Sequence, residues 1–147
     1  MRAVTKGLFS FCLAALCAGA LSPAALAAPQ VSLSRGAMSF ADLCIGGTAG
    51  PLCFTITNTG GGPLVINSIR ITHCSSSIDP TYIDCTKVAG FQISSGGAPG
   101  SLAPGQVRTV CITFSPQQPA TFDSHVVITT NAAGPPIDVP LHGTGDP

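Results

Sequence analysis

Short runs in which apolar and polar residues alternate recur along the chain from residue 31 onward. From Leu52 to Thr57, apolar side chains alternate with cysteine and threonine, and the same period recurs from Thr109 to Phe114 and from His125 to Thr129. A period of two places every second side chain on the same face of a β-strand. After residue 28, no long stretch repeats apolar residues at helical spacing without an intervening Gly or Pro. The pattern therefore predicts an all-β chain.

Turn residues divide the chain into about seven short strands. The segment from Asn58 to Pro63 ends the first run, and in the next run the apolar parity changes between Ile66 and Ile69, as a β-bulge would produce. A last strand from Ile137 to Leu141 contains Pro140, which predicts a place at a sheet edge or the end of pairing. Shorter candidate strands are Val31 to Leu33, Ala37 to Phe40 and Phe91 to Ile93. Short strands separated by Gly, Pro and Asn predict a β-sandwich.

The first 27 residues differ from the rest of the chain. Arg2 and Lys6 precede an apolar stretch from Leu8 to Leu21, and the small-residue motif Ala25 to Ala27 follows. These features are typical of a secretory signal peptide, so we predict cleavage after residue 27 and a single domain over residues 28–147. No later segment approaches the roughly 18 apolar residues of a spanning helix. We expect a protein without a membrane span, secreted or located in the periplasm.

Charge is scarce in this chain. Charged residues make up 8% of it, against about a quarter in a typical soluble domain. Loss of the predicted signal peptide would leave four cationic residues against six aspartates, a net charge of −2. Without a basic excess the chain is not suited to bind nucleic-acid phosphates, and its hydrophobic content of 45% argues against disorder. The few acid and base side chains favour a non-enzymatic module.

Five segments carry a family resemblance, and they follow one another along nearly all of the predicted mature chain. They are Phe54 to Gly60, Pro63 to Ile66, Leu102 to Gly105, Ile112 to Pro116 and Leu141 to Gly145. In these segments the sequence resembles the ASH/Hydin-type immunoglobulin-like domain, known in bacteria as the choice-of-anchor D domain. The resemblance implies an immunoglobulin-like β-sandwich of about seven strands, related to the major-sperm-protein and pilus-chaperone folds. Bacterial members often place a cysteine just after the Pro-Gly turn, where this chain has Gln106 to Arg108.

Two turns in these segments have a physical explanation. The segment Asn58 to Gly62 supplies residues that tolerate a positive φ angle between two strands. Pro104 and Gly105 suit the two central positions of a type II turn. Both motifs therefore indicate structural roles.

Five cysteines follow the predicted signal peptide, and in an exported protein they are disulfide candidates first. Our first choice joins Cys74 to Cys85, because this bridge would close a loop rich in Ser, Asp and Pro. For a second bridge we favour Cys53 with Cys111, since both occupy off-core positions of strands that would be neighbours in this type of sandwich. Cys44 with Cys53 is the competing choice. In the favoured pairing Cys44 remains an unpaired thiol.

A metal or cofactor site has weaker support. His73, Cys74 and Cys85 could ligate a metal, but the chain lacks C-x-x-C spacing and a recognisable set of four ligands. The glycine-rich stretches lack the Lys-Ser/Thr of a phosphate-binding loop. We therefore expect neither a metal nor a cofactor.

Histidines and aspartates on the predicted strands have a plain interpretation. His125 lies at an off-core strand position and His142 precedes the last Gly-Thr-Gly, without a Gly-x-Ser-x-Gly context, so we expect surface histidines and no general bases. Asp123 and Asp138 would need a separation of about 5 to 10 Å to act as paired carboxylates in glycoside hydrolysis. Nothing in the sequence sets that distance, and we expect solvated aspartates at strand ends.

The sequence favours a non-enzymatic, exported module that binds a protein partner or self-assembles, with strand addition at a sheet edge as a mode of binding. It predicts no nucleic-acid partner and disfavours a small-molecule ligand. The first alternative is a surface or carbohydrate-binding adhesin module, which would use the long loops His73 to Gly90 and Ser94 to Gly105, with Tyr82 as a contact residue. The second is a small thiol-dependent redox protein or hydrolase that uses Cys44.

Overall fold

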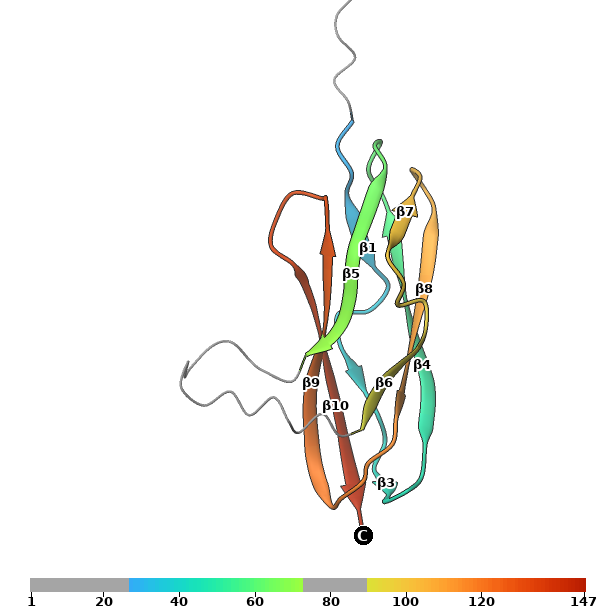
Figure 1. The fold of residues 1–147 in the computed structure, drawn as a ribbon, viewed down its shortest axis with the longest axis vertical. Coiled ribbons are helices and arrows are strands. Elements are labelled where there is room, and N and C mark those ends of the chain that lie inside the picture. The colour runs from blue at the N-terminus through green and yellow to red at the C-terminus, as the bar shows by residue number, and fades with distance from the viewer. Residues whose placement is uncertain (1–26, 73–89) are drawn as a thin grey trace, which may run out of the picture.

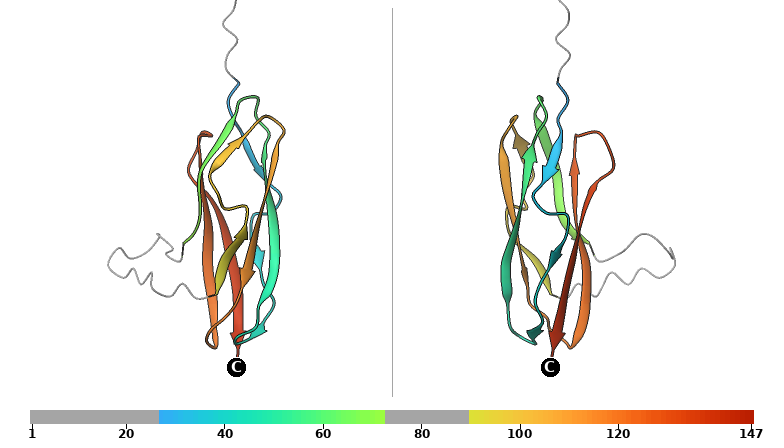
Figure 2. Two further views of the ribbon diagram at one scale, coloured as in Figure 1. Left: turned by 45° about the vertical axis from the view of Figure 1, so that its right-hand side comes forward. Right: turned by 180° about the vertical axis from the view of Figure 1, so that it is seen from behind.

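Two β-sheets packed face to face make up the part of the chain that the computed structural model describes, residues 27–72 and 90–147 (Figure 1). Sheet A has the strand order β1-β4-β8-β6, and sheet B has the order β2-β10-β9-β5-β7, with β3 also paired to β10. Two further views show the sheets on opposite sides of one core (Figure 2). The strands are β1 (Val31–Leu33), β2 (Met38–Ser39), β3 (Leu43–Cys44), β4 (Ala49–Asn58), β5 (Leu64–Thr72), β6 (Phe91–Ser95), β7 (Gly100–Leu102), β8 (Val107–Phe114), β9 (Ala120–Thr130) and β10 (Ile137–Asp146).

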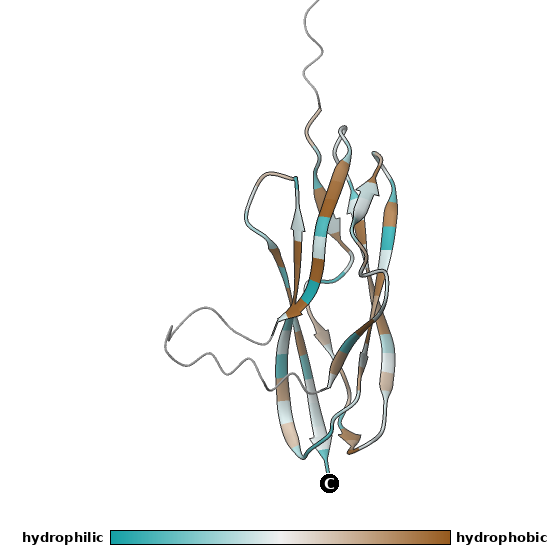
Figure 3. Ribbon diagram, in the orientation of Figure 1, coloured by the Kyte–Doolittle hydropathy of each residue, from teal (hydrophilic) through white to brown (hydrophobic). Residues whose placement is uncertain are grey.

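Alternate residues of the long strands fill the space between the sheets. On β8, Val110, Ile112 and Phe114 are buried, and the residues between them are half-buried. On β9 the buried positions run in the same way from Phe122 to Ile128. Figure 3 shows this period as bands of hydrophobic and hydrophilic residues along the strands. The predicted all-β sandwich is thus confirmed.

The strand boundaries differ from the predicted ones in three ways. The described residues contain ten strands, because β3 and β7 are too short to show a period of two in the sequence. β9 begins at Ala120, before the predicted run, and β10 continues to Asp146. The predicted bulge is confirmed, since the register of β5 against β9 shifts between Ile66 and Ser68.

The prediction that Pro140 marks a sheet edge or the end of pairing holds on the β2 side of β10 and fails on the β9 side. β10 pairs with β9 on one side and with β2 and β3 on the other, and its pairing continues past Pro140. The ladder with β2 begins only at Leu141. The carbonyl of His142 faces β2 and accepts a hydrogen bond from the Phe40 N–H at 2.8 Å. Because backbone groups two residues apart face the same side, the proline nitrogen also faces β2, at a point where no ladder bond is required.

Four phenylalanines from different segments pack together in the core. The ring centroid of Phe114 lies 4.7 Å from that of Phe91, 5.6 Å from that of Phe122 and 5.7 Å from that of Phe40. These separations are typical of favourable aromatic pairs. A Cβ atom added at Gly143 would come within 2.8 Å of the Phe114 ring. The core therefore requires a glycine on β10 at this point.

The glycine turn after β4 was predicted to supply residues that tolerate positive φ angles, but its glycines do not adopt them. The glycines with positive φ in the described residues do not include any from Gly60 to Gly62. Instead, the chain at residues 27–30 lies against the turn, and a Cβ atom at Gly60 or Gly62 would overlap the carbonyl oxygens of Ala28 and Ala27. Close approach of two backbones, rather than φ, therefore requires these glycines.

The type II turn predicted at Pro104 and Gly105 is confirmed. Gly105 has a φ of 78°, and the Gln106 N–H donates to the Ala103 carbonyl at 3.0 Å. A positive φ at the third residue and this hydrogen bond between the first and fourth residues define the turn.

Asn58, at the end of β4, is a fully buried polar residue with 0% of its surface exposed. Its side-chain N–H groups donate to the carbonyls of Gly62 and Leu102 at 2.8 and 2.9 Å, and its Oδ1 accepts from the Gly60 N–H at 3.0 Å. Its own backbone N–H donates to the Gln106 carbonyl at 3.0 Å. The side chain of Asn58 thus ties the glycine turn to β7, and the backbone of the same residue bonds to the segment before β8.

We expect Asn58→Ala to lower the free energy of unfolding by about 2 to 3 kcal/mol, because it leaves two buried carbonyls and one half-buried N–H without a hydrogen bond. Urea denaturation of the variant and the wild type measures this difference. Asn67→Ala, at an exposed position of β5, is the control and should change the value by less than about 0.5 kcal/mol. Equal effects at the two positions would contradict a structural role for the buried amide.

Candidate functional site

The open edges of the sheets are the first candidate site, because an edge strand presents unpaired backbone N–H and C=O groups. Among the described strands, β1 and β7 contain three residues each, and β2 and β3 contain two each. β4 extends beyond β1, but its free part includes Pro51, which has no N–H to offer. β6 contains five residues, Phe91–Ser95, without a proline or a charge. Beyond its pairing with β7, β5 also leaves residues 67–72 open on that side, but they include the charged Arg70. Among the described strands, β6 is therefore the longest open edge without a proline or a charged residue.

The backbone of β6 has a defined direction at this edge. The Gly90 carbonyl faces β8, where it accepts a hydrogen bond from the Ser115 N–H at 2.7 Å. Because the direction of the backbone polar groups alternates along a strand, those of Gln92 also face β8. The N–H and C=O groups of Phe91 and Ile93 then face away from β8. An added strand would meet two donors and two acceptors there.

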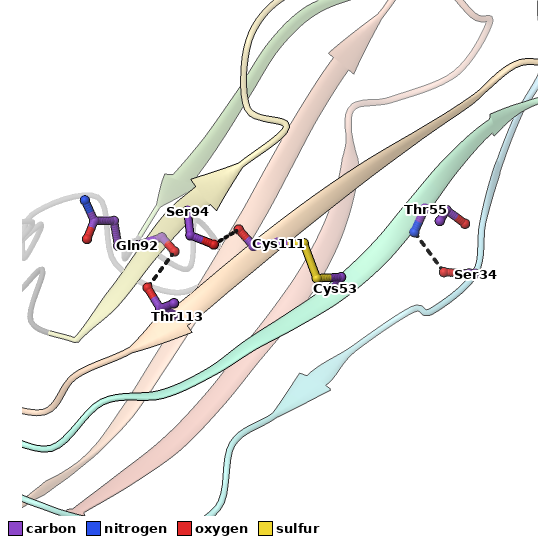
Figure 4. Close-up of a disulfide and its surroundings, with 7 residues drawn as sticks. All are labelled: Ser34, Cys53, Thr55, Gln92, Ser94, Cys111 and Thr113. Atoms are coloured by element: carbon purple, nitrogen blue, oxygen red, sulfur yellow. Dashed lines mark hydrogen bonds between the residues drawn. A yellow bond between two sulfur atoms is a disulfide. The ribbon is translucent and has the colours of Figure 1, made fainter.

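Packing and hydrogen bonds hold β6 in place on sheet A. Phe91 is buried and stacks on the core phenylalanines, and Ile93 packs against the same core. The Ser94 hydroxyl donates to the Cys111 carbonyl at 3.1 Å, as Figure 4 shows. After Ser95 the chain turns away at Gly96, whose φ is 78°. β6 is therefore held in place by its core-facing side chains and by its pairing with β8.

The crossover from β6 to β7 carries the chain from sheet A to sheet B. Arg108 on β8 holds it, since its Nη1 donates to the Ala98 carbonyl at 2.5 Å. A Cβ atom at Gly100 would come within 2.7 Å of the same guanidinium. This crossover determines where the β6 edge ends.

A disulfide joins the two central strands of sheet A. Cys53 on β4 and Cys111 on β8 are register partners, and their sulfur atoms are 2.08 Å apart (Figure 4). This is the pairing that the sequence favoured for the second bridge. The competing pairing of Cys44 with Cys53 does not occur, because Cys44 is a free, exposed thiol on β3. Cys74 and Cys85, the first choice, lie outside the described residues.

The outer face of sheet A surrounds this disulfide and carries no charged side chain among the described residues; we call it the neutral face. Thr55 and Thr109 are register partners, as are Thr57 and Val107, and Gln92 and Thr113. Charge was not part of the sequence prediction for this face. The signal was nevertheless present, because the off-core positions of these runs are threonine, serine, cysteine and glutamine.

The outer face of sheet B carries two pairs of histidine and aspartate; we call it the charged face. His125 Nδ1 lies 2.8 Å from Asp138 Oδ1, and His142 Nδ1 lies 2.7 Å from Asp123 Oδ1. The two aspartates therefore pair with histidines and not with each other, unlike the paired carboxylates considered from the sequence. His125 is half-buried and the other three side chains are exposed, and exposed ion pairs stabilise a fold little. Sequence reasoning missed them because they depend on the register of β9 with β10.

The remaining predicted site residues can be placed only in part. His73 and Tyr82, like the two loop cysteines, lie outside the described residues. Within residues 27–72 and 90–147, no group of three or more His, Cys, Asp or Glu side chains could hold a metal ion. In the same part of the chain, no helix is long and apolar enough to cross a membrane.

Comparison with known proteins identifies the fold. No family model matches the sequence, and no curated protein matches it significantly. The structure is similar to the ASH/PapD-like domain 7 of human CEP192, with a TM-score of 0.56 and 15% identity over 99% of this chain and 97% of that chain. It is also similar to a protein of unknown function from Porphyromonas gingivalis W83, with a TM-score of 0.57 and 16% identity over 86% of this chain.

A third similar structure is the periplasmic chaperone SfaE, with a TM-score of 0.51 and 13% identity over 80% of this chain. The chain spans 51% of the Porphyromonas protein and 59% of the chaperone. At these identities the likeness concerns the fold. The protein has an immunoglobulin-like sandwich of the ASH/PapD-like type, as the sequence resemblance implied.

Proposed function

We propose that this protein is an exported, non-enzymatic interaction module that binds an extended segment of a partner protein along β6. The observation that carries the proposal is the open five-residue edge of β6, with the backbone groups of Phe91 and Ile93 directed away from β8. An extended peptide that pairs with such an edge gains main-chain hydrogen bonds. Its alternate side chains would contact the neutral face and the rim of the core.

Export rests on two independent features. Residues 1–27 have the basic start, apolar stretch and Ala-x-Ala motif of a signal peptide. The Cys53–Cys111 disulfide suits an oxidising compartment. We accordingly place the mature protein, residues 28–147, in the periplasm or outside the cell.

A non-enzymatic role is supported by the composition of the described surfaces. The acid and base side chains of the charged face form two separate His–Asp pairs. The hydroxyl groups of the neutral face have no charged neighbour on that face. Neither arrangement combines a nucleophile, a base and a group that orients the base, as covalent catalysis requires.

We expect Ile93→Pro to weaken partner binding by about tenfold or more, because it removes an outward N–H and with it one main-chain hydrogen bond to the added strand. Proline is tolerated at an edge position whose N–H faces solvent, and circular dichroism checks that the variant folds. The assay is retention of proteins from the native envelope and secreted fractions by immobilised wild type and variant. Ile93→Val is the control and should retain the same partner.

Two results would contradict the proposal. One is that the wild type retains no partner protein. The other is that a folded Ile93→Pro variant binds as well as Ile93→Val does. In the second case the partner would contact a surface other than the β6 edge.

A further inference from the structure

The charged and histidine side chains of the described strands are distributed very unevenly between the two sheets. On sheet B, the positions that carry them on the outer face are Arg70, Asp123, His125, Asp138, His142 and Asp146. On sheet A, the strands β1, β4 and β6 contain none, and β8 contains Arg108. Arg108 lies at a core-facing position of β8, and its guanidinium donates a hydrogen bond to the crossover between β6 and β7. The neutral face is thus free of charge across all four of its strands.

A face of this composition can pack against another protein surface without removing a charge from water. Interface cores are depleted of charged residues for this reason. The half-buried disulfide lies in the middle of the face, and Val107 at one end is 55% exposed. Threonine methyl groups add further apolar area between the hydroxyls. The face is therefore less costly to desolvate than the charged face opposite.

The hydrogen-bonding groups of the neutral face match those of an identical face. A hydroxyl group both donates and accepts, and an amide offers both functions as well. The outward side chains that supply these groups are Thr55, Thr57, Thr109, Thr113, Gln92 and Ser94. In an interface with two-fold symmetry the same patch meets itself, so it must be self-complementary. A hydroxyl face satisfies this condition, whereas a face of one charge sign would not.

The size of the face is compatible with a weak dimer. The four strands of sheet A contain 3, 10, 8 and 5 residues, and at about 4.8 Å between strands and about 3.3 Å per residue they give a flat area of about 400 Å². Two such areas bury about 800 Å², in the range of weak, transient interfaces. We infer that the neutral face is a homodimer interface, in which the same face of a second copy packs against it across a two-fold axis. This interface is separate from the β6 edge, which remains open at the side of sheet A.

Light scattering during size-exclusion chromatography tests the inference. Purified protein, expressed from the full-length gene, is measured between about 1 μM and about 1 mM, where a micromolar dissociation constant is resolved. We expect a reversible dimer. Thr109→Lys places a cation at the centre of both faces and should raise the dissociation constant by about tenfold or more. Thr121→Lys makes the same change at an exposed position of β9 and should leave the dimer intact.

Three outcomes would overturn the inference. They are a wild type that is monomeric over the whole range, a dimer that Thr109→Lys leaves unchanged, and a dimer that Thr121→Lys weakens equally. The first of these includes a monomeric protein that binds a different protein through Thr109. Ile93→Pro should leave the dimer intact, so failure of the strand-addition proposal and failure of this one are distinguishable. Circular dichroism of each lysine variant checks that it is folded.

Discussion

Phe114→Ala should lower the free energy of unfolding by about 4 kcal/mol, because truncation of a buried phenylalanine leaves a cavity as well as lost burial. For a domain of this size that corresponds to a fall in melting temperature of about 15 °C. Phe114 is 0% exposed and contacts three other aromatic rings. Differential scanning calorimetry and urea denaturation measure the two quantities. Phe114→Leu, which retains most of the volume, should cost roughly half as much.

Gly143 provides an independent test of the same packing. In the wild type, Gly143→Ala should destabilise by about 1 to 3 kcal/mol, since the new Cβ atom overlaps the Phe114 ring and the core is already filled. In the Phe114→Ala background the ring is absent, and the added methyl group has room. The destabilisation of the double variant should therefore be smaller than the sum of the two single effects by about 1 kcal/mol or more. Additive effects would contradict direct packing of the ring on this glycine.

The parts of the fold predicted from the sequence are those that a local signal determines. A period of two along Thr109 to Phe114 is sufficient to predict which side chains of β8 face the core. The parity change at Ile66 likewise predicts the bulge, because a bulge alters the pattern on its own strand. The turn at Gly105 is local in the same sense, since its two central residues determine its φ angles.

The features that sequence reasoning missed depend on contacts between distant segments. Pro140 lies inside sheet B because the ladder with β2 begins one residue later, and no property of β10 alone shows where β2 pairs. Gly60 to Gly62 are required by the chain at residues 27–30, about thirty residues earlier in the sequence. For the glycines, the residue type was recognised correctly and its physical cause was not.

The candidate site shows the same difference between features with a local sequence signal and features that depend on contacts between distant segments. The off-core positions of Cys53 and Cys111 were visible in the sequence, and their pairing followed once the two strands were taken as neighbours. The edge position of β6 is different, because it depends on which strands remain unpaired after the sheets have formed. No local sequence pattern indicates which strands will remain unpaired. A run of five uncharged residues without proline becomes informative only when the topology places it at an edge.

Removal of the Cys53–Cys111 disulfide should lower the free energy of unfolding by about 4 kcal/mol, the chain-entropy value for a sequence separation of 58. Since natural domains are stable by about 5 to 15 kcal/mol, the double variant Cys53→Ser/Cys111→Ser should be only marginally folded. Both cysteines lie on the neutral face, half-buried, so the substitution leaves no core cavity. The loss then measures mainly the constraint on the unfolded chain. Cys44→Ser, at the free thiol, should leave the stability unchanged and is the control.

Reduction by dithiothreitol distinguishes the contribution of the Cys53–Cys111 bridge from that of any other disulfide. In the wild type, the loss on reduction should equal the loss measured for the double variant plus the contribution of any second disulfide. In the double variant itself, a further loss on reduction requires a second disulfide among the remaining cysteines. The predicted Cys74–Cys85 bridge would close a short loop and contribute about 3 kcal/mol in the same entropy model. A double variant within about 1 kcal/mol of the wild type would instead show that the ladder between β4 and β8 constrains the chain without the disulfide.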